Sequence, residues 1–112
     1  MKQHAFVCDI KGRGGHGAMP DTAIDPVMAA AALIHSADAR LPSGVSVNWH
    51  SVQGGTRFNI IPENISVSGS LLVCETDADT AKSALENTVE QVMSAFRTEG
   101  ALHFTGEVPE WT

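Results

Sequence analysis

The sequence predicts an α+β sandwich in which a four-stranded antiparallel sheet carries two helices on one face. Four segments alternate apolar and polar residues, as strands do, and two segments place apolar residues at helical spacing. Their order along the chain is β-α-β-β-α-β. With short links and right-handed crossovers, this order favours the split βαβ arrangement, in a single domain spanning 1–112.

The first strand and the first helix come from the N-terminal part of the chain. The strand is HAFVCDIKG, with alternating apolar residues Phe6, Cys8 and Ile10. Asp25 offers a side-chain acceptor at a helix N-cap, and Pro26 suits the first turn. The apolar stripe of the helix that follows is Val27, Met28, Ala31 and Ile34. The segment Pro42 to Gly44 then ends this helix.

Two consecutive strands and a connecting loop follow the first helix. The first of them, VSVNWHSVQ, has one apolar face, formed by Val45, Val47 and Trp49. The loop GGTRFNIIPEN leads to ISVSGSLLVCE, whose apolar face is Ile65, Val67, Leu71 and Val73. A glycine inside a strand marks a bulge or a close approach, and Gly69 predicts one of the two here.

The second helix begins after a polar and acidic segment. Thr76, followed by Asp77 and Asp79, caps and charges the helix N-terminus. The apolar stripe of this helix is Ala81, Leu85, Val89, Val92, Met93 and Phe96. Gly100 ends it, and ALHFTGEV forms the last strand. Together these elements predict a ferredoxin-like fold.

The charge of the chain is acidic, with a formal net of -6 and no cluster of Lys and Arg. Nucleic acids and anionic membranes attract basic surfaces, so neither is an expected partner. No apolar run approaches the roughly 20 residues that cross a bilayer, and MKQHAFVCDI lacks a signal-peptide layout, so we expect a cytoplasmic protein. Cys8 and Cys74 lack CxxC spacing, which favours two reduced thiols in the core.

The loop GRGGHGAMP poses a choice between phosphate and histidine chemistry. Gly12, Gly14 and Gly17 fit the G-x-G-x-x-G spacing that cradles a dinucleotide pyrophosphate. Such a loop runs straight from a strand into a helix, because the helix N-terminus supplies the amide donors. Here several residues separate Gly17 from the cap at Asp25. The spacing therefore favours glycines that keep bulk away from a group approaching His16.

Each candidate site residue also has an ordinary interpretation when it is taken alone. His16 could be an exposed loop residue, and Asn59 in GGTRFNIIP could shape the turn before Ile-Ile-Pro. Ser51 and Ser70 lie in strands without a neighbouring base, which argues against a nucleophilic triad. The remaining histidines are expected at the surface or at a sheet edge: His4, His35, His50 and His103. The sequence has no HExxH, HxD or paired ligand spacing, so we expect no metal or other cofactor bound by this chain.

The two glycine motifs together resemble one enzyme family. GRGGHGAMPDTAIDPVMAAAALI, followed by VQGGTRFNIIPENISVSGSL, is similar to the inserted dimerisation, or lid, domain of metal-dependent aminoacylases and carboxypeptidases. The amidohydrolases of the hippurate hydrolase and auxin-conjugate hydrolase type look nearest. The resemblance covers nearly the whole chain. It implies a parent enzyme whose separate catalytic domain holds one or two divalent metals, usually zinc, and hydrolyses N-acyl amino acids or related amides. That catalytic domain is absent from this chain, which we expect to be inactive alone.

The resemblance also implies roles for particular residues. His16 would reach across a dimer to the partner's active site and stabilise the oxyanion of the tetrahedral intermediate. Asn59 would bind the carbonyl or carboxylate of the substrate from the same side. Gly54 and Gly55 would let the loop that carries Asn59 come close to the substrate.

The expected partner is a second copy of the chain. The strand around Val45 to Val52 should lie at a sheet edge, where unpaired backbone groups offer a template to a two-fold partner, with the first helix beside it. Trp49 then belongs either to this interface or to the core. An alternative function is a free-standing regulatory module of the same fold that binds a small metabolite through its glycine loops. That alternative leaves the co-occurrence of the two motifs unexplained.

Overall fold

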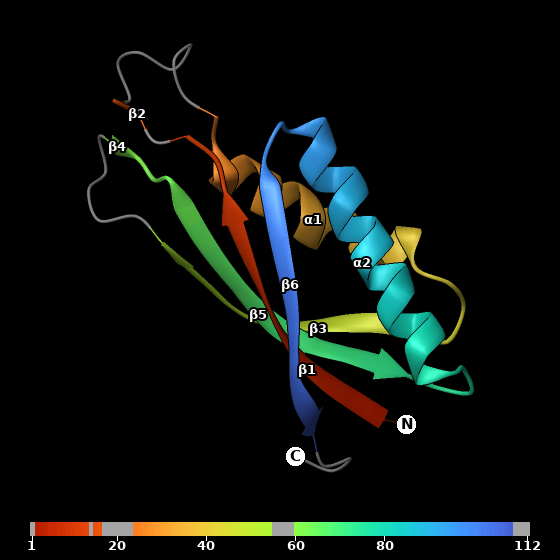
Figure 1. Ribbon diagram of the computed structural model, residues 1–112. Helices are drawn as coiled ribbons and strands as arrows, with labels where there is room; N and C mark the ends of the chain where they lie inside the picture. Colours follow the sequence, from red (N-terminus) through yellow and green to blue (C-terminus); the bar gives the residue numbers. More distant parts are fainter. Residues whose placement is uncertain (1, 14, 17–23, 55–59, 109–112) are drawn as a thin grey trace.

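The computed structural model describes residues 2–13, 15–16, 24–54 and 60–108. A sheet forms one layer and two helices form the other (Figure 1). The long strands are β1 (Lys2–Lys11), β3 (Val45–Gly54), β5 (Asn64–Val73) and β6 (Glu99–Val108). The helices are α1 (Pro26–Arg40) and α2 (Ala78–Ala95). The short strands β2 (Gly15–His16) and β4 (Ile60–Ile61) pair separately.

The four long strands pair antiparallel in the order β3-β5-β1-β6. This arrangement confirms the predicted α+β fold. Strands β3 and β6 are therefore the two edges of the sheet. Helix α1 packs over β3, β5 and β1, whereas α2 packs over β6 and β5. In the described part of the chain, no helix is long and apolar enough to cross a membrane.

The core lies between the sheet and the helices and follows the predicted alternation of β1. Phe6, Cys8 and Ile10 are all buried. The Phe6 ring meets Trp49 edge-on, with 5.7 Å between ring centroids, so Trp49 packs against the core. Phe6 lies opposite Gly69 of β5. A Cβ on Gly69 would come within 2.6 Å of the Asn48 carbonyl oxygen, which makes Gly69 the predicted tight contact.

The apolar stripe predicted for α1 is wrong. Val27 and Met28 are 43% and 56% exposed, and the buried residues are Pro26, Ala29, Ala30, Leu33 and Ala37. The helix is apolar almost all the way round, so periodicity alone does not choose a face. Its small residues settle the choice, because alanines let the helix axis approach the sheet closely. The N-cap is as predicted, since the Asp25 carboxylate accepts a hydrogen bond from Val27 N at 2.8 Å.

Both ends of α2 differ from the prediction. The N-cap is Asp77 and not Thr76, because the Asp77 carboxylate accepts a hydrogen bond from Thr80 N at 3.1 Å. The helix ends at Ala95, before Gly100. Arg97, with φ of 58°, takes the left-handed conformation that commonly follows a helix and that glycine usually supplies.

His4 also departs from the expected surface position. It continues the alternation of Phe6 and Cys8 and is 7% exposed on the helix-facing side of the sheet. Its Nε2 atom is buried and has no hydrogen-bond partner among the described residues. The alternation of β1 thus extends further toward the N-terminus than its apolar residues indicated.

Of the two thiols expected in the core, Cys8 is buried, but Cys74 is exposed, so the expectation is wrong for Cys74. We predict that Cys8 resists alkylation while the chain is folded. Burial, and secondly the Asp9 carboxylate, raise the pKa of the Cys8 thiol from 9.0 to about 11. Only the thiolate reacts with iodoacetamide. At pH 8, mass spectrometry should therefore find the exposed Cys74 modified and Cys8 modified only in urea. Modification of both thiols at equal rates without urea would contradict the prediction.

The same raised pKa gives the folded state a pH dependence. Between pH 9 and about 11 the unfolded chain loses the Cys8 proton while the folded chain keeps it. The free energy of unfolding therefore falls as the pH rises through this window, by about 1.4 kcal/mol per pH unit at most.

Candidate functional site

The two glycine motifs meet at one end of the molecule. Strand β2 pairs with β4 in antiparallel register, so that Gly15 lies opposite Ile61 and His16 lies opposite Ile60. The backbone of His16 is thereby placed beside the residue that follows Asn59 in the chain. Figure 1 shows β2 and β4 next to each other, beyond the ends of β1 and β5. The fold therefore brings together two motifs that are far apart in the sequence.

Backbone hydrogen bonds fix both ends of the loop that carries His16. Arg13 N donates to Ile24 O at 2.8 Å, and Ile24 N donates to Arg13 O at 3.0 Å. Gly12 N donates to Glu63 O at 2.8 Å, which ties this loop to the start of β5. A Cβ on Gly12 would collide with the Ile24 carbonyl oxygen. The first glycine of the motif thus serves to close the loop.

The N-terminus of α1 is poorly suited to bind a phosphate. The Asp25 carboxylate already accepts a hydrogen bond from the Val27 amide, and its negative charge lies at the positive end of the helix dipole. Residues 17–23, which lie outside the described residues, separate Gly15 and His16 from this helix. The glycine spacing is therefore not accompanied by the helix geometry that pyrophosphate binding needs.

Three of the four predicted site residues are described incompletely or not at all. For His16 the backbone is described as part of β2, and Gly55 and Asn59 lie outside the described residues. Gly54 is the last residue of β3, with φ of 154°. A Cβ there would collide with Ile65 Cδ1 and lie 2.8 Å from Asn64 O. Packing against β5 therefore requires a glycine at this position, where the loop toward Asn59 begins.

Sequence reasoning missed a base next to Ser70. His50 Nε2 lies 3.0 Å from Ser70 Oγ, joining β3 to β5. The strand register explains why this pair was not predicted, because a bulge between Trp49 and Ser51 changes which residues of β3 and β5 face each other. Ser70 is 3% exposed and lies within a strand, so its hydroxyl offers almost no surface to a substrate carbonyl. We assign the pair a structural role, like that of the 2.6 Å contact between Ser51 Oγ and Ser68 Oγ.

The two edges of the sheet differ in charge. Strand β3 has the sequence VSVNWHSVQG, without Asp, Glu, Lys, Arg or Pro. Strand β6 has glutamates near both of its ends, Glu99 and Glu107. Natural edge strands usually carry charges or prolines that prevent pairing with other chains. Val52 of β3 is 52% exposed, and the exposed Val27 and Met28 belong to the helix that covers the same side of the sheet. The side chains of β3 are therefore uncharged, although the Asp38 carboxylate of α1 accepts a hydrogen bond from Val47 N at 3.0 Å and covers the edge at that point.

The described residues do not supply a set of metal ligands. Among them, no three His, Cys, Asp or Glu side chains lie close enough together to hold an ion.

Comparison with known proteins identifies the family. Residues 3–97 match the family model of the peptidase dimerisation domain. The chain belongs to this family. An IAA-amino acid hydrolase ILR1-like 2 of Arabidopsis thaliana is 33% identical over 95 residues, covering 80% of this chain and 20% of that protein. The N-acetylcysteine deacetylase of Bacillus subtilis is 32% identical over 82 residues, covering 68% of this chain and 22% of that protein.

Solved structures share the fold of this peptidase dimerisation domain. An aminobenzoyl-glutamate utilization protein from Klebsiella pneumoniae superposes with a TM-score of 0.82 at 19% identity, over 96% of this chain and 29% of that one. A hydantoinase/carbamoylase family amidase from Burkholderia ambifaria gives 0.83 at 15% identity, over 96% and 28%. The chain spans about a fifth of the length of the two curated relatives above.

Proposed function

We propose that this peptidase dimerisation domain forms the homodimer of a metal-dependent amidohydrolase and lies over its active site. Two relatives are named for the hydrolysis of amino-acid conjugates and the deacetylation of an N-acetylated amino acid. These names support N-acyl amino acids or related amides as the substrate class. The family match favours this role over that of a metabolite-binding module.

The proposal rests on the uncharged edge of β3 beyond Val47, whose amide donates to the Asp38 carboxylate. Two copies related by a two-fold axis can pair their β3 strands antiparallel and continue one sheet into the other. No charged side chain on β3 opposes this contact. Val52 adds exposed apolar area on β3, and Val27 and Met28 are exposed on α1, the helix that packs over β3, β5 and β1. The β6 edge, by contrast, carries the charged side chains Glu99 and Glu107.

The loops at the β2 and β4 end are proposed to reach the partner's active site. We propose that His16 stabilises the oxyanion that forms when the amide carbonyl is attacked, and that Asn59 holds the carbonyl or carboxylate of the substrate. Pairing of β2 with β4 supports a joint role, because it holds the two loops together. Gly54 and Gly55 are proposed to let the second loop approach the substrate. The zinc or similar divalent metal of such an enzyme would need ligands from outside the described residues.

Blocking the β3 edge tests the dimer. In the variant Val52→Lys, each subunit brings a positive charge to the two-fold interface. Each ammonium group would also have to lose its bound water when the dimer forms. We expect the dimer dissociation constant to rise at least tenfold, equivalent to about 1.4 kcal/mol, in sedimentation equilibrium.

The matched control is Thr105→Lys, which adds the same charge to an exposed position on the β6 edge. This variant should dimerise like the wild type. An equal loss of dimer in both variants, or a wild-type chain that stays monomeric at high micromolar concentration, would contradict the proposed interface.

A further inference from the structure

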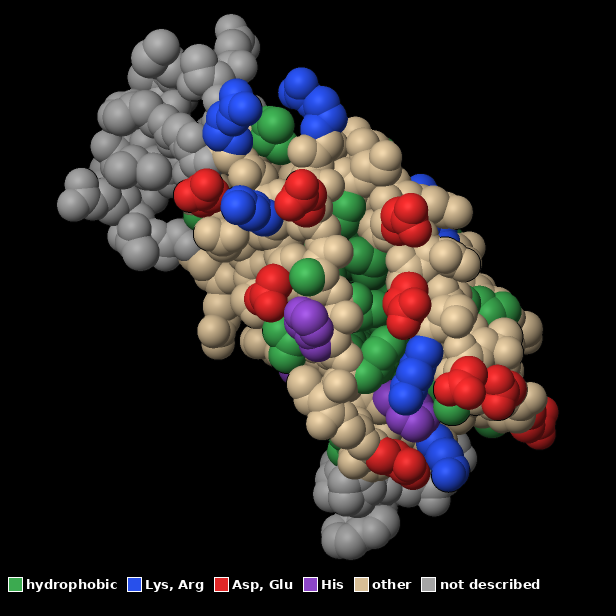
Figure 2. Space-filling model, in the orientation of Figure 1, with side chains coloured by type: hydrophobic (Ala, Val, Ile, Leu, Met, Phe, Trp, Pro, Cys, Tyr) green, Lys and Arg blue, Asp and Glu red, His purple; other side chains and the backbone are tan. Residues whose placement is uncertain are grey.

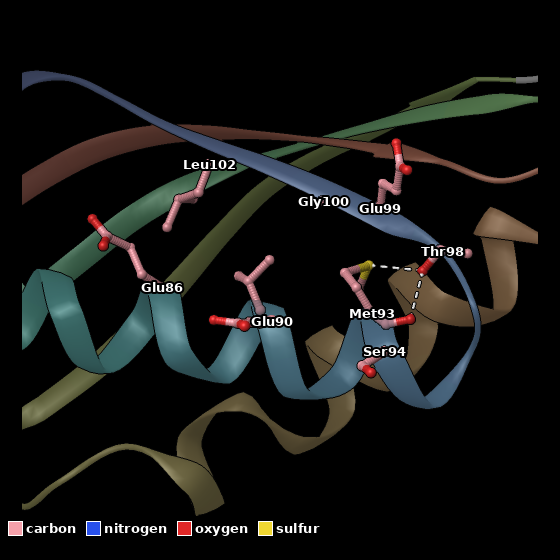
Figure 3. A pocket seen from close by; sticks show the side chains of 9 residues that line it. Glu86, Glu90, Met93, Ser94, Thr98, Glu99, Gly100 and Leu102 are labelled. Atoms are coloured by element: carbon pink, nitrogen blue, oxygen red, sulfur yellow. Dashed lines mark hydrogen bonds between the residues drawn. The ribbon is translucent and has the colours of Figure 1, made fainter.

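A second surface lies on the opposite side of the domain from β3. A groove of about 490 Å³ runs between α2 and β6. Its lining includes Val89 and Met93 of α2, with Gly100 and Leu102 of β6. A Cβ on Gly100 would lie 2.8 Å from Met93 Cγ, so a glycine is needed for this close approach. Figure 3 shows Leu102 pointing toward α2, which makes the floor of the groove apolar.

Acidic side chains border this groove along α2. Glu86 and Glu90 are four residues apart and therefore lie on the same side of the helix. Both are exposed, and neither forms an ion pair with another described residue. Figure 2 shows a strip of hydrophobic side chains between acidic ones in this part of the molecule. Lys82, one turn before Glu86, lies over the Phe104 ring at 5.2 Å and ends the acidic row.

The backbone of β6 is available next to the groove. From Glu99 to Phe104 the strand pairs regularly with β1, and a bulge follows at Thr105. No strand pairs with the other side of β6 within the described part of the chain. The alternate amide and carbonyl groups of 99–104 that face outward can therefore pair with an added strand. The Glu99 carboxylate points away from α2 (Figure 3) and would meet the other face of such a strand.

We propose that the β6 edge and this groove bind an extended basic segment of a protein partner. Alternate side chains of a strand added beside β6 would be about 6.6–6.8 Å apart along the strand. Glu86 and Glu90 are separated by about 6 Å along the helix axis. Lysines or arginines two positions apart can thus reach one glutamate each, while their aliphatic stems lie over the partly exposed Leu102. The position facing Lys82 would not be basic.

The charges argue against a second copy of this chain as the occupant. Two β6 strands paired about a two-fold axis would bring the Glu86 and Glu90 rows of two acidic domains together. Like charges at close range oppose such pairing. The same glutamates attract the positive charges of a basic segment. Strand β3 has no charged residues, so its edge does not favour a basic segment over a second copy of the chain.

A synthetic peptide tests the proposal on the full chain. The probe is a ten-residue peptide in which lysine alternates with threonine, and its controls replace every lysine by glutamate or methylate alternate backbone amides. We expect binding of the lysine peptide by fluorescence anisotropy, and at least tenfold slower hydrogen exchange of amides within 100–104. Neither control peptide should bind.

Variants of the chain test whether the charges of α2, and not a change in folding, determine peptide binding. Glu86→Gln combined with Glu90→Gln should weaken binding of the lysine peptide at least threefold, with unchanged thermal unfolding and unchanged dimerisation through β3. The matched control, Glu63→Gln with Glu75→Gln, makes the same change in net charge at exposed positions away from the groove. Three results would each overturn the proposal: no binding at millimolar peptide, equal weakening by both double variants, or protection of β3 amides in place of β6 amides.

Discussion

In the amidohydrolase to which we propose this domain belongs, replacing His16 by alanine lowers kcat by about 10²- to 10³-fold. The reason is that a hydrogen-bond donor placed where negative charge develops stabilises the transition state more than the bound substrate. KM should change much less than kcat, because the donor meets its charge only during the reaction. The measurement is steady-state hydrolysis of an N-acyl amino acid. His103→Ala, at an exposed position on β6, is the matched control and should keep wild-type kcat.

Mixed dimers decide whether His16 acts on the partner's active site. One variant carries His16→Ala and the other lacks the catalytic metal ligands, so that each homodimer is inactive. If subunits associate at random, half of the dimers are mixed and each holds one complete site, which restores about a quarter of the wild-type activity. Activity that stays at the level of the separate variants would show that His16 does not work across the interface. The control mixes the metal-ligand variant with itself.

The fold could be predicted from the sequence because its strands alternate clearly. In β1, Phe6, Cys8 and Ile10 face the helices as expected, and Asp25 caps α1 through the carboxylate that the sequence offers. The buried face of α1 could not be predicted. A helix with apolar residues on every side has no preferred face until its packing partners are known. The burial of His4 could not be predicted for the same reason, since it depends on what covers the end of β1.

The site could be predicted only as two motifs with a shared role. Nothing in the local sequence pairs His16 with Ile60, because that contact depends on where the ends of β1 and β5 come together. The hydrogen bond between His50 and Ser70 was missed for a related reason. A bulge in β3 shifts the register by one residue, and such a shift leaves no reliable sequence signal. The difference between the β3 and β6 edges was visible in composition, but the strand order was needed to show that both are edges.

Replacing Phe6 by alanine should lower the free energy of unfolding by about 3 to 5 kcal/mol. Phe6 is buried at the centre of the sheet, where its ring meets Trp49 of β3 and Phe104 of β6 edge-on. It also covers Gly69, which has no side chain to fill the space. The neighbours therefore cannot close the cavity without moving strands. Domains of this size are stable by about 5–15 kcal/mol, so the variant should lose a large share of its stability.

Urea unfolding followed by circular dichroism measures this loss, with Phe104→Ala as the matched control. Phe104 has the same side chain but is only partly buried, so its removal should cost clearly less. Equal losses in the two variants would show that the cavity at Phe6 collapses and that the ring is not the centre of the core. Phe6 also connects the core to the β3 edge through Trp49. A mild replacement such as Phe6→Leu should therefore speed hydrogen exchange in β3 before it unfolds the domain, and weaken the proposed dimer with it.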